Sequence, residues 1–161
     1  MCLLALVSPL VSSVGAGTAE NPATSADTEP SGVQTPEASS GPQLEFTAFH
    51  DLSFIQATRS GSPVALYFEA DWCAPCQKMH ASTFREPAVL EAASGFRLFR
   101  VDLTNADFQV NVIRKSFEVR GAPTIILFGP DGKERMRRFG FISADEFVRM
   151  LHKSGQPAKG T

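Results

Sequence analysis

Two cysteines, Cys73 and Cys76, are separated by two residues in the segment Trp72-Cys73-Ala74-Pro75-Cys76. Thiols at this spacing can close a small disulfide and reopen it, which is the chemistry of thiol–disulfide exchange. The apolar run 64–68 precedes the pair and predicts a buried strand. We therefore expect the cysteines to lie where this strand gives way to a helix.

A helix that begins at Cys73 would give the two sulfurs different roles. The Cys73 thiolate would lie among free backbone N–H groups at the positive end of the helix dipole, so we expect it to be the nucleophile. Cys76, one turn further on, would be shielded and would act as the resolving thiol. Pro75 suits an early helical position. Trp72 would provide an aromatic wall beside the reactive sulfur, which can exclude water and contact a partner.

Two other readings of the cysteine pair are less favoured. The pair could be half of a zinc site, with His80 as a third ligand, but the only further cysteine is Cys2. A second cysteine pair, which structural zinc usually requires, is therefore missing. A purely structural disulfide is also possible, but so short a loop constrains little chain entropy. We expect no metal and no cofactor.

The composition indicates one soluble globular domain. The chain has 161 residues, 43% of them hydrophobic, and a formal net charge of -2. This charge points to neither nucleic acid nor a membrane surface as a partner. We expect a monomer.

The chain divides by composition into four segments. Residues 1–19 resemble a secretory signal peptide, although no Lys or Arg precedes their apolar core. Residues 20–43 have the composition of a flexible linker. Residues 44–155 form the predicted domain, and residues 156–161 a disordered tail. We expect a periplasmic or otherwise exported protein, and an uncleaved N-terminal membrane anchor is the alternative.

Strand and helix patterns alternate through the predicted domain. They indicate an α/β fold with a mixed central sheet of four to five strands, flanked by helices on both faces. The helix over 51–60 carries Leu52 and Ile55 on its apolar face. Ser143 and Glu146 predict a capping box at the start of the last helix. Strands are expected at 44–49, 64–69, 97–103, 125–128 and 133–141, and helices at 51–60, 73–83, 86–94, 107–117 and from Ser143 onward.

Three separated landmarks resemble the thioredoxin superfamily. They are the segment Trp72 to Cys76, the step Ala122-Pro123-Thr124 before an apolar strand, and Gly140 in the final hairpin. The resemblance covers roughly residues 44–153 and implies the thioredoxin fold. Within the superfamily, the stretches 69–73, 83–89 and 101–104 are most similar to the C-terminal periplasmic domain of the DsbD thiol:disulfide interchange protein and to its single-domain relatives.

The resemblance also implies how a substrate would bind. Pro123 would be a cis-proline that faces Cys73, and the backbone of Ala122 would pair with an extended substrate strand. A trans proline at the start of a strand is the alternative reading.

Two positions depart from the family pattern. The family carries a buried Asp six residues before the first cysteine, where this chain has Tyr67, and the DsbD domain has a Glu at the position of His80. Glu69 shares a strand face with Tyr67, so we hypothesise that Glu69 or His80 moves the proton that the Asp moves in the family. The alternatives are a solvated or ion-paired strand end for Glu69 and an exposed helix position for His80.

These observations predict a thiol:disulfide oxidoreductase that acts through Cys73 and Cys76. A reductant of disulfides in exported proteins is favoured, with a membrane thiol-electron donor of the DsbD type implied by the resemblance. One alternative is an oxidant or isomerase of disulfides. Another is a non-catalytic thioredoxin-fold module whose cysteine pair senses redox state.

Overall fold

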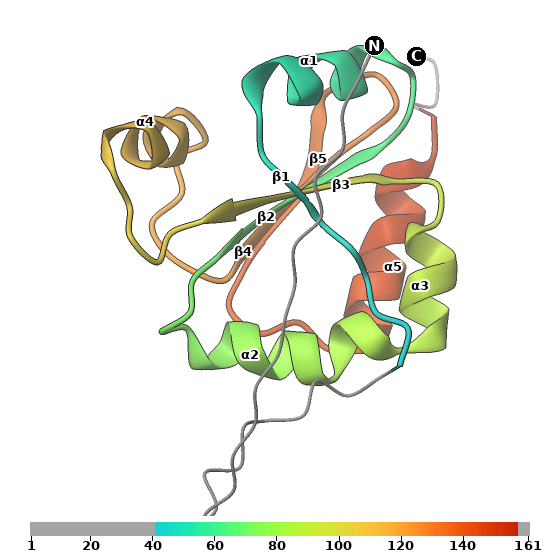
Figure 1. The fold of residues 1–161 in the computed structure, drawn as a ribbon. Coiled ribbons are helices and arrows are strands. Elements are labelled where there is room, and N and C mark those ends of the chain that lie inside the picture. The colour runs from blue at the N-terminus through green and yellow to red at the C-terminus, as the bar shows by residue number, and fades with distance from the viewer. Residues whose placement is uncertain (1–40, 158–161) are drawn as a thin grey trace, which may run out of the picture. The chain divides into compact units, whose positions relative to one another are not determined.

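A computed structural model describes residues 41–157 of the chain. The signal-peptide-like segment 1–19, most of the predicted linker and residues 158–161 of the predicted tail lie outside the described residues. A five-stranded sheet in the order β1-β3-β2-β4-β5 forms the centre of the described part (Figure 1). The strands are β1 (Thr47–Ala48), β2 (Val64–Glu69), β3 (Arg97–Asp102), β4 (Thr124–Phe128) and β5 (Glu134–Phe139).

The sheet is mixed, as predicted. Strands β1 and β2 both pair in parallel with β3, whereas β4 runs antiparallel to both β2 and β5. The predicted edge strand over 44–49 is at the edge, but it is shorter than expected because only Thr47 and Ala48 join the ladder. The chain before β1 is drawn away from the ladder, since the N–H of Leu44 donates to the carbonyl of Phe84 at 2.8 Å.

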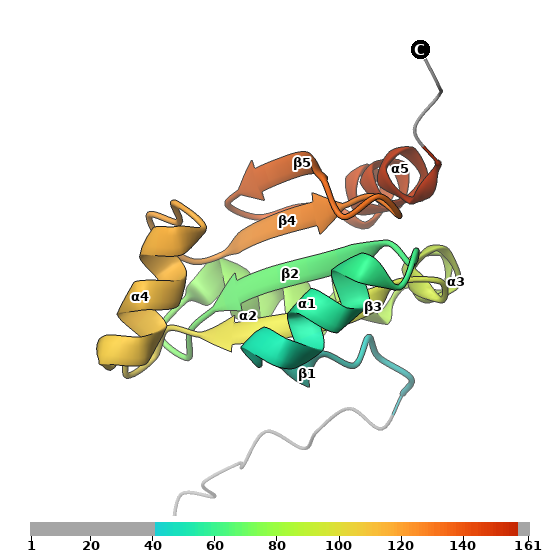
Figure 2. The same ribbon diagram turned by 90° about the horizontal axis from the view of Figure 1, so that it is seen from above.

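Helices cover both faces of the sheet, which confirms the predicted layering (Figures 1 and 2). Two helices lie on one face, and three helices and a short 3₁₀ helix lie on the other. The first group is α1 (Asp51–Arg59) and α4 (Phe108–Ser116); the second is α2 (Ala74–Ala81), η1 (Thr83–Arg85), α3 (Pro87–Ala93) and α5 (Ala144–Gly155).

Each face of the sheet carries its own aromatic cluster. Every residue of β2 is buried, and its side chains alternate between the two faces. Tyr67 lies on the α2 face, where its ring centroid is 5.3 Å from that of Phe84. Phe68 points to the other face, 5.9 Å from Phe117. There Phe54 of α1 also contacts Phe99, Phe117 and Phe128.

Helix α1 has the predicted bounds within one residue, but its predicted inner face is wrong. Leu52 and Ile55 are 65% and 42% exposed. Phe54 and Ala57, which are three residues apart and therefore on one side of the helix, pack on the core instead. The aromatic ring of Phe54 fills the space above the sheet, so the helix turns that side inward.

The predicted capping box at the last helix is only half formed. The hydroxyl of Ser143 accepts a hydrogen bond from the N–H of Glu146 at 3.4 Å, as predicted. The carboxylate of Glu146 forms an ion pair with Arg138 of β5 at 2.5 Å. This cross-element pair takes the side chain that would otherwise return to the backbone of Ser143.

Candidate active site

The cysteine pair lies between β2 and α2, where the sequence predicts it. Cys73 has an extended backbone and is the N-cap of α2, which begins at Ala74. The N–H of Cys76 donates to the sulfur of Cys73 at 3.2 Å. A backbone donor directed at this sulfur stabilises negative charge on it, which favours Cys73 over Cys76 as the thiolate. The helix was predicted over 73–83 but ends at Ala81, and the 3₁₀ helix η1 begins at Thr83.

Cys73 and Cys76 form a disulfide with a Cα–Cα distance of 5.2 Å. Both cysteines are buried in this oxidised form, at 3% and 2% exposed. Exposure therefore does not distinguish the two sulfurs. Their positions on the helix do, because only Cys73 precedes the first turn and receives a helix N–H.

Two neighbours of the cysteines occupy the positions that the sequence predicts. Pro75 lies in the first turn of α2, where the absence of its N–H breaks no helical hydrogen bond. Trp72 directly precedes Cys73 and is 64% exposed. So large an exposed aromatic surface beside a disulfide suits contact with another molecule better than it suits exclusion of water.

The segment of Ala122 and Pro123 lies at the same end of the sheet as the cysteines. Thr124, which follows Pro123, pairs with Phe68 near the end of β2. The Ala122–Pro123 peptide bond is cis. Pro123 is buried and Ala122 is partly exposed. The N–H of Gly140 donates to the carbonyl of Pro123 at 2.9 Å, so the final hairpin supports this segment.

Glu69, His80 and Arg100 form a charged cluster beside the cysteine pair. One carboxylate oxygen of Glu69 lies 2.5 Å from Nε2 of His80, and the other lies 3.0 Å from Nη1 of Arg100. Glu69 is 9% exposed. Burial raises the pKa of its carboxyl, but the hydrogen bonds and charges of His80 and Arg100 outweigh burial and lower the pKa. Glu69 thus forms an ion pair with Arg100, which agrees with one of the alternatives given for Glu69 from the sequence.

A hollow of about 450 Å³ is lined by this cluster and by Cys76. The sequence places Glu69 and His80 as separate candidates, whereas the structure brings them together with Cys76. The sequence analysis did not identify Arg100. In β3, Arg100 alternates with the buried Phe99 and Val101, and this alternation indicates that its side chain lies on the other face of the strand. The hollow is lined by Glu69, Ala70, Asp71, Cys76, Gln77, His80 and Arg100.

Comparison with known proteins identifies the family. A family model described as a thioredoxin-like domain matches residues 50–155. The chain belongs to this thioredoxin-like family.

Relatives of this thioredoxin-like chain include thiol:disulfide interchange proteins. The protein DsbD of Salmonella choleraesuis (strain SC-B67) is 34% identical over 123 residues, which make up 73% of this chain and 22% of DsbD. The chain thus spans about a fifth of the length of that relative. Among solved structures, the reduced C-terminal domain of DsbD from Neisseria meningitidis is 26% identical, with a TM-score of 0.57. The match covers 68% of this chain and all of that domain.

A second solved structure supports the same fold. The protein Trxlp of Edwardsiella tarda EIB202 is 29% identical, with a TM-score of 0.53. The match covers 65% of this chain and 98% of Trxlp. The five-stranded mixed sheet with helices on both faces is therefore a thioredoxin fold.

Tyr67 occupies the position at which the family resemblance implies a buried Asp. Its side chain is fully buried, and its hydroxyl has no hydrogen-bond partner among residues 41–157. Burial and the charge of Glu69 raise the pKa of the Tyr67 hydroxyl far above its usual value. Tyr67 therefore stays protonated and does not replace the Asp as a proton acceptor.

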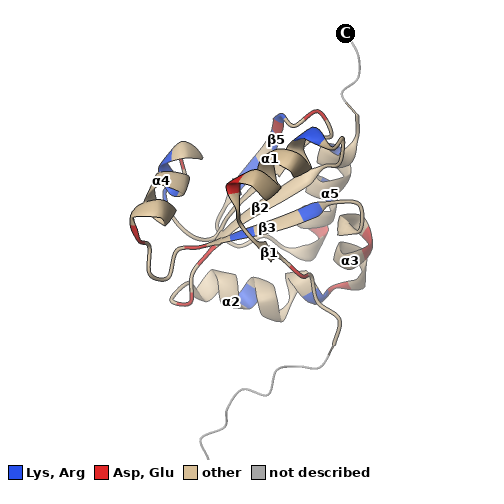
Figure 3. Cartoon of the chain, turned by 45° about the horizontal axis from the view of Figure 1, so that its top comes forward, with Lys and Arg blue, Asp and Glu red and all other residues tan. Residues whose placement is uncertain are grey.

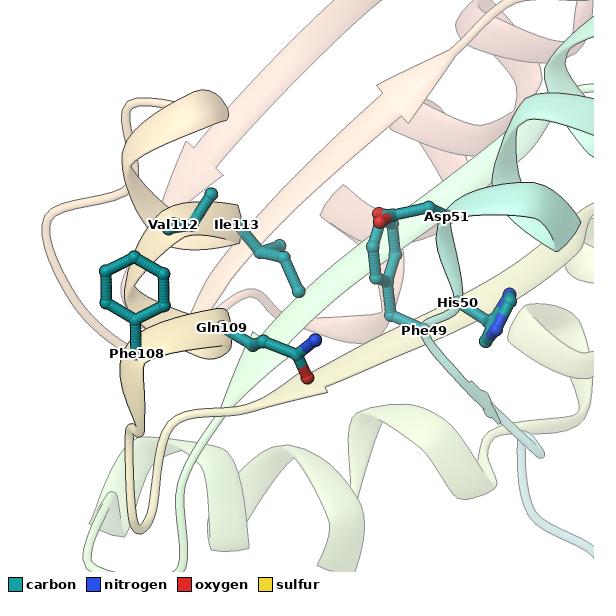
Figure 4. Close-up of a pocket in the computed structure, with 7 residues that line it drawn as sticks. All are labelled: Phe49, His50, Asp51, Phe108, Gln109, Val112 and Ile113. Atoms are coloured by element: carbon teal, nitrogen blue, oxygen red, sulfur yellow. The ribbon is translucent and has the colours of Figure 1, made fainter.

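Another hollow of this thioredoxin-like domain, of about 360 Å³, lies between α4 and the start of α1 (Figure 4). It is lined by no cysteine, and Figure 4 shows His50 pointing away from α4. Within the described range 41–157, no three His, Cys, Asp or Glu side chains group in a way that could hold a metal ion. No helix in the same range is long and apolar enough to cross a membrane.

Proposed function

We propose that this chain is a thiol:disulfide oxidoreductase that acts through Cys73 and Cys76. One observation carries the proposal: the two sulfurs form a disulfide at the start of α2, where a helix N–H donates to Cys73. This position favours a thiolate at Cys73 once the disulfide is reduced. The name of the curated relatives, thiol:disulfide interchange protein, supports the same chemistry.

The reaction requires two exchange steps. The Cys73 thiolate attacks one sulfur of a substrate disulfide, and the other substrate sulfur leaves as a thiolate that takes a proton. Cys76 then loses its proton and attacks Cys73. This second step forms the Cys73–Cys76 disulfide and releases the substrate as a dithiol, so two electrons pass from the protein to the substrate.

We further propose that a substrate strand binds along Ala122 and Pro123. These residues begin the segment beside the end of β2, and Ala122 is partly exposed. An extended chain could pair there with the backbone N–H and C=O of Ala122. The exposed ring of Trp72 would contact the same substrate next to Cys73.

A reducing role fits these residues best. Pro75 before the second cysteine is a thioredoxin-like feature, and thioredoxin is strongly reducing. The substrates would be disulfides of exported proteins, and a membrane thiol donor of the DsbD type would return electrons to a monomeric protein outside the cytoplasm. A measured reduction potential well above roughly −200 mV would instead assign the protein to disulfide formation or isomerisation.

Cysteine variants test the proposal directly. The wild-type protein should reduce insulin catalytically with a dithiol as electron source. Cys73→Ser should abolish turnover, and Cys76→Ser should accumulate mixed disulfides with substrates that mass spectrometry assigns to Cys73. Cys2→Ser is the matched control and should keep wild-type turnover. Absence of turnover in the wild type, together with no trapped disulfide in Cys76→Ser, would leave only a non-catalytic binding module.

A further inference from the structure

We infer that His80 exchanges the proton of Cys76, and that Glu69 and Arg100 are positioning residues that hold the His80 ring for this task. The inference rests on the proposed thiol–disulfide exchange, because the second step of that reaction requires Cys76 to lose a proton. The sequence left open whether Glu69 or His80 moves the proton. Here His80 moves it, and Glu69 and Arg100 position the His80 ring.

The placement of His80 carries the first part of the inference. His80 follows Cys76 by four residues in α2, so the two side chains lie one turn apart on the same side of the helix. Both line the hollow of about 450 Å³. The side chain of His80 is 40% exposed, whereas Cys76 is buried. The imidazole thus shares a hollow with the buried thiol and also reaches solvent, so it can exchange a proton with each directly or through water.

The contacts of Glu69 decide which of the two groups is the base. Its carboxylate is occupied by Nε2 of His80 and by Arg100. Both carboxylate oxygens are thus engaged, so neither is free to accept the thiol proton. A neutral imidazole with one nitrogen bound in this way keeps a lone pair on its other nitrogen and can accept the proton.

The ionised carboxylate also fixes the His80 tautomer. Glu69 accepts the hydrogen on Nε2, which leaves the lone pair of Nδ1 as the free acceptor of a neutral ring. Arg100 holds the second carboxylate oxygen at 3.0 Å and so keeps Glu69 oriented toward the helix. A carboxylate placed in this way holds the imidazole ring in one orientation without taking the proton itself.

Three other polar side chains lie around His80 or its hollow. Tyr67 of β2 lies 5.9 Å from the His80 ring, centroid to centroid, and stays protonated. Asp71 lines the hollow from the loop after β2. Arg85 of η1 donates to the His80 carbonyl at 3.1 Å. Among the described residues that line the hollow, His80 is the proton acceptor that shares both this hollow and helix α2 with Cys76.

The step balances within the protein. The proton of the Cys76 thiol passes to Nδ1 of His80, which leaves a Cys76 thiolate and an imidazolium. The thiolate attacks the Cys73 sulfur of the mixed disulfide, so the Cys73–Cys76 bond forms and the bond from Cys73 to the substrate sulfur breaks. The electron pair leaves with the substrate thiolate, and His80 returns its proton to that thiolate or to water.

One rapid-mixing experiment separates the two steps. Reduced protein is mixed with dithiobis(nitrobenzoate), an aromatic disulfide that releases one coloured thiolate when Cys73 attacks and a second when Cys76 resolves the mixed disulfide. The first phase depends on reagent concentration and the second does not. In the wild type, we expect the second rate to rise with pH through a step near neutrality. In His80→Gln this step should vanish, and the second rate at pH 7 should fall about tenfold or more.

Two further variants refine the test. Glu69→Gln keeps the imidazole but not its oriented partner, so we expect a smaller fall in the second rate than in His80→Gln. His152→Gln, on the exposed side of α5, is the matched control and should leave both phases unchanged. All variants should show a first phase close to wild type, because His80 is assigned to Cys76.

The outcomes distinguish this inference from the proposed function. A wild-type protein without a first phase near neutral pH would contradict the proposed function itself. A normal first phase, with a second phase in His80→Gln whose pH profile matches the wild type, would overturn only the role of His80. A second phase that is lost in Glu69→Gln but kept in His80→Gln would make Glu69 the base and would also overturn the inference.

Discussion

Glu69 is a buried carboxylate that contacts two other elements of the fold. It ends the fully buried strand β2, and its carboxylate is shared between His80 of α2 and Arg100 of β3. A buried carboxylate without partners would be costly, whereas one that accepts hydrogen bonds from His80 and Arg100 is stabilised in its charged form. The same side chain therefore links the sheet to the helix that carries Cys76.

The charge on Glu69 should make folding stability depend on pH in a defined direction. In the folded protein, the pKa of Glu69 lies below its ordinary value of 4.5. The folded state therefore binds this proton less readily than the unfolded state, and the carboxylate contributes stability above that ordinary value. This contribution is lost as the pH falls through the folded pKa.

We expect Glu69→Gln to flatten the decline in the free energy of unfolding below about pH 4.5. Urea unfolding at a series of pH values from neutral to acid measures this slope. Glu91→Gln, at an exposed position of α3, is the control and should keep the wild-type slope. A decline in Glu69→Gln as steep as that of the wild type would show that another group governs acid unfolding.

The residues of the site could be predicted from the sequence, but not all of their contacts. The spacing of Cys73 and Cys76 and the apolar run before them were enough to place the disulfide at a helix start. The period of two in β2 placed Glu69 on the same face as Tyr67. Arg100 was missed because its contact with Glu69 depends on the register of β2 against β3, to which no local pattern points.

At the scale of elements, the final hairpin supports the segment that precedes β4. Gly140 has a φ of +88°, a conformation that side chains with a Cβ rarely adopt. From this conformation its N–H donates to the carbonyl of Pro123. A Cβ at Gly140 would meet no atom within 4 Å, so backbone strain is the only obstacle to a side chain there.

Gly140→Ala should therefore lower the free energy of unfolding by about 1 kcal/mol. Gly95→Ala is a matched control, because a Cβ at Gly95 also meets no atom within 4 Å and its φ is not in the left-handed region. We expect that variant to be neutral or slightly stabilising. Equal unfolding midpoints in urea for the two variants would contradict the strain at Gly140.

Elements with strong local patterns were predicted better than elements that depend on distant contacts. The bounds of β2 were predicted from a continuous apolar run, which is typical of a strand buried on both faces. The strand predicted at 44–49 includes only Thr47–Ala48, because the backbone N–H of Leu44 donates to the carbonyl of Phe84 in η1 instead of to the sheet. The inward face of α1 was wrong because Leu52 and Phe54 are both apolar, and only packing decides between them.

At the scale of the whole described domain, two aromatic layers share one central strand. Phe84 packs between Tyr67 of β2 and Phe147 of α5, whereas Phe54 packs on the opposite face. Because β2 contributes side chains to both layers, loss of one layer removes support from the other. We therefore expect the two layers to unfold together.

Phe84→Ala should lower the free energy of unfolding by about 3–5 kcal/mol, and Phe54→Ala by less, since Phe54 is only partly buried. In both variants, near-UV and far-UV circular dichroism should report the same urea midpoint. Phe108→Ala, at a side chain that is 82% exposed, should change stability by less than about 0.5 kcal/mol. Two separate midpoints in Phe54→Ala would mean that the layers fold independently.

The fluorescence of Trp72 should report whether the Cys73–Cys76 pair is oxidised or reduced. It is the only tryptophan in the chain, and it directly precedes one sulfur of the disulfide. A disulfide quenches the emission of a nearby excited indole, so fluorescence should brighten when the bond opens and dim when it closes. Because this indole is also 64% exposed, a docked polypeptide would shift the emission wavelength of the same signal.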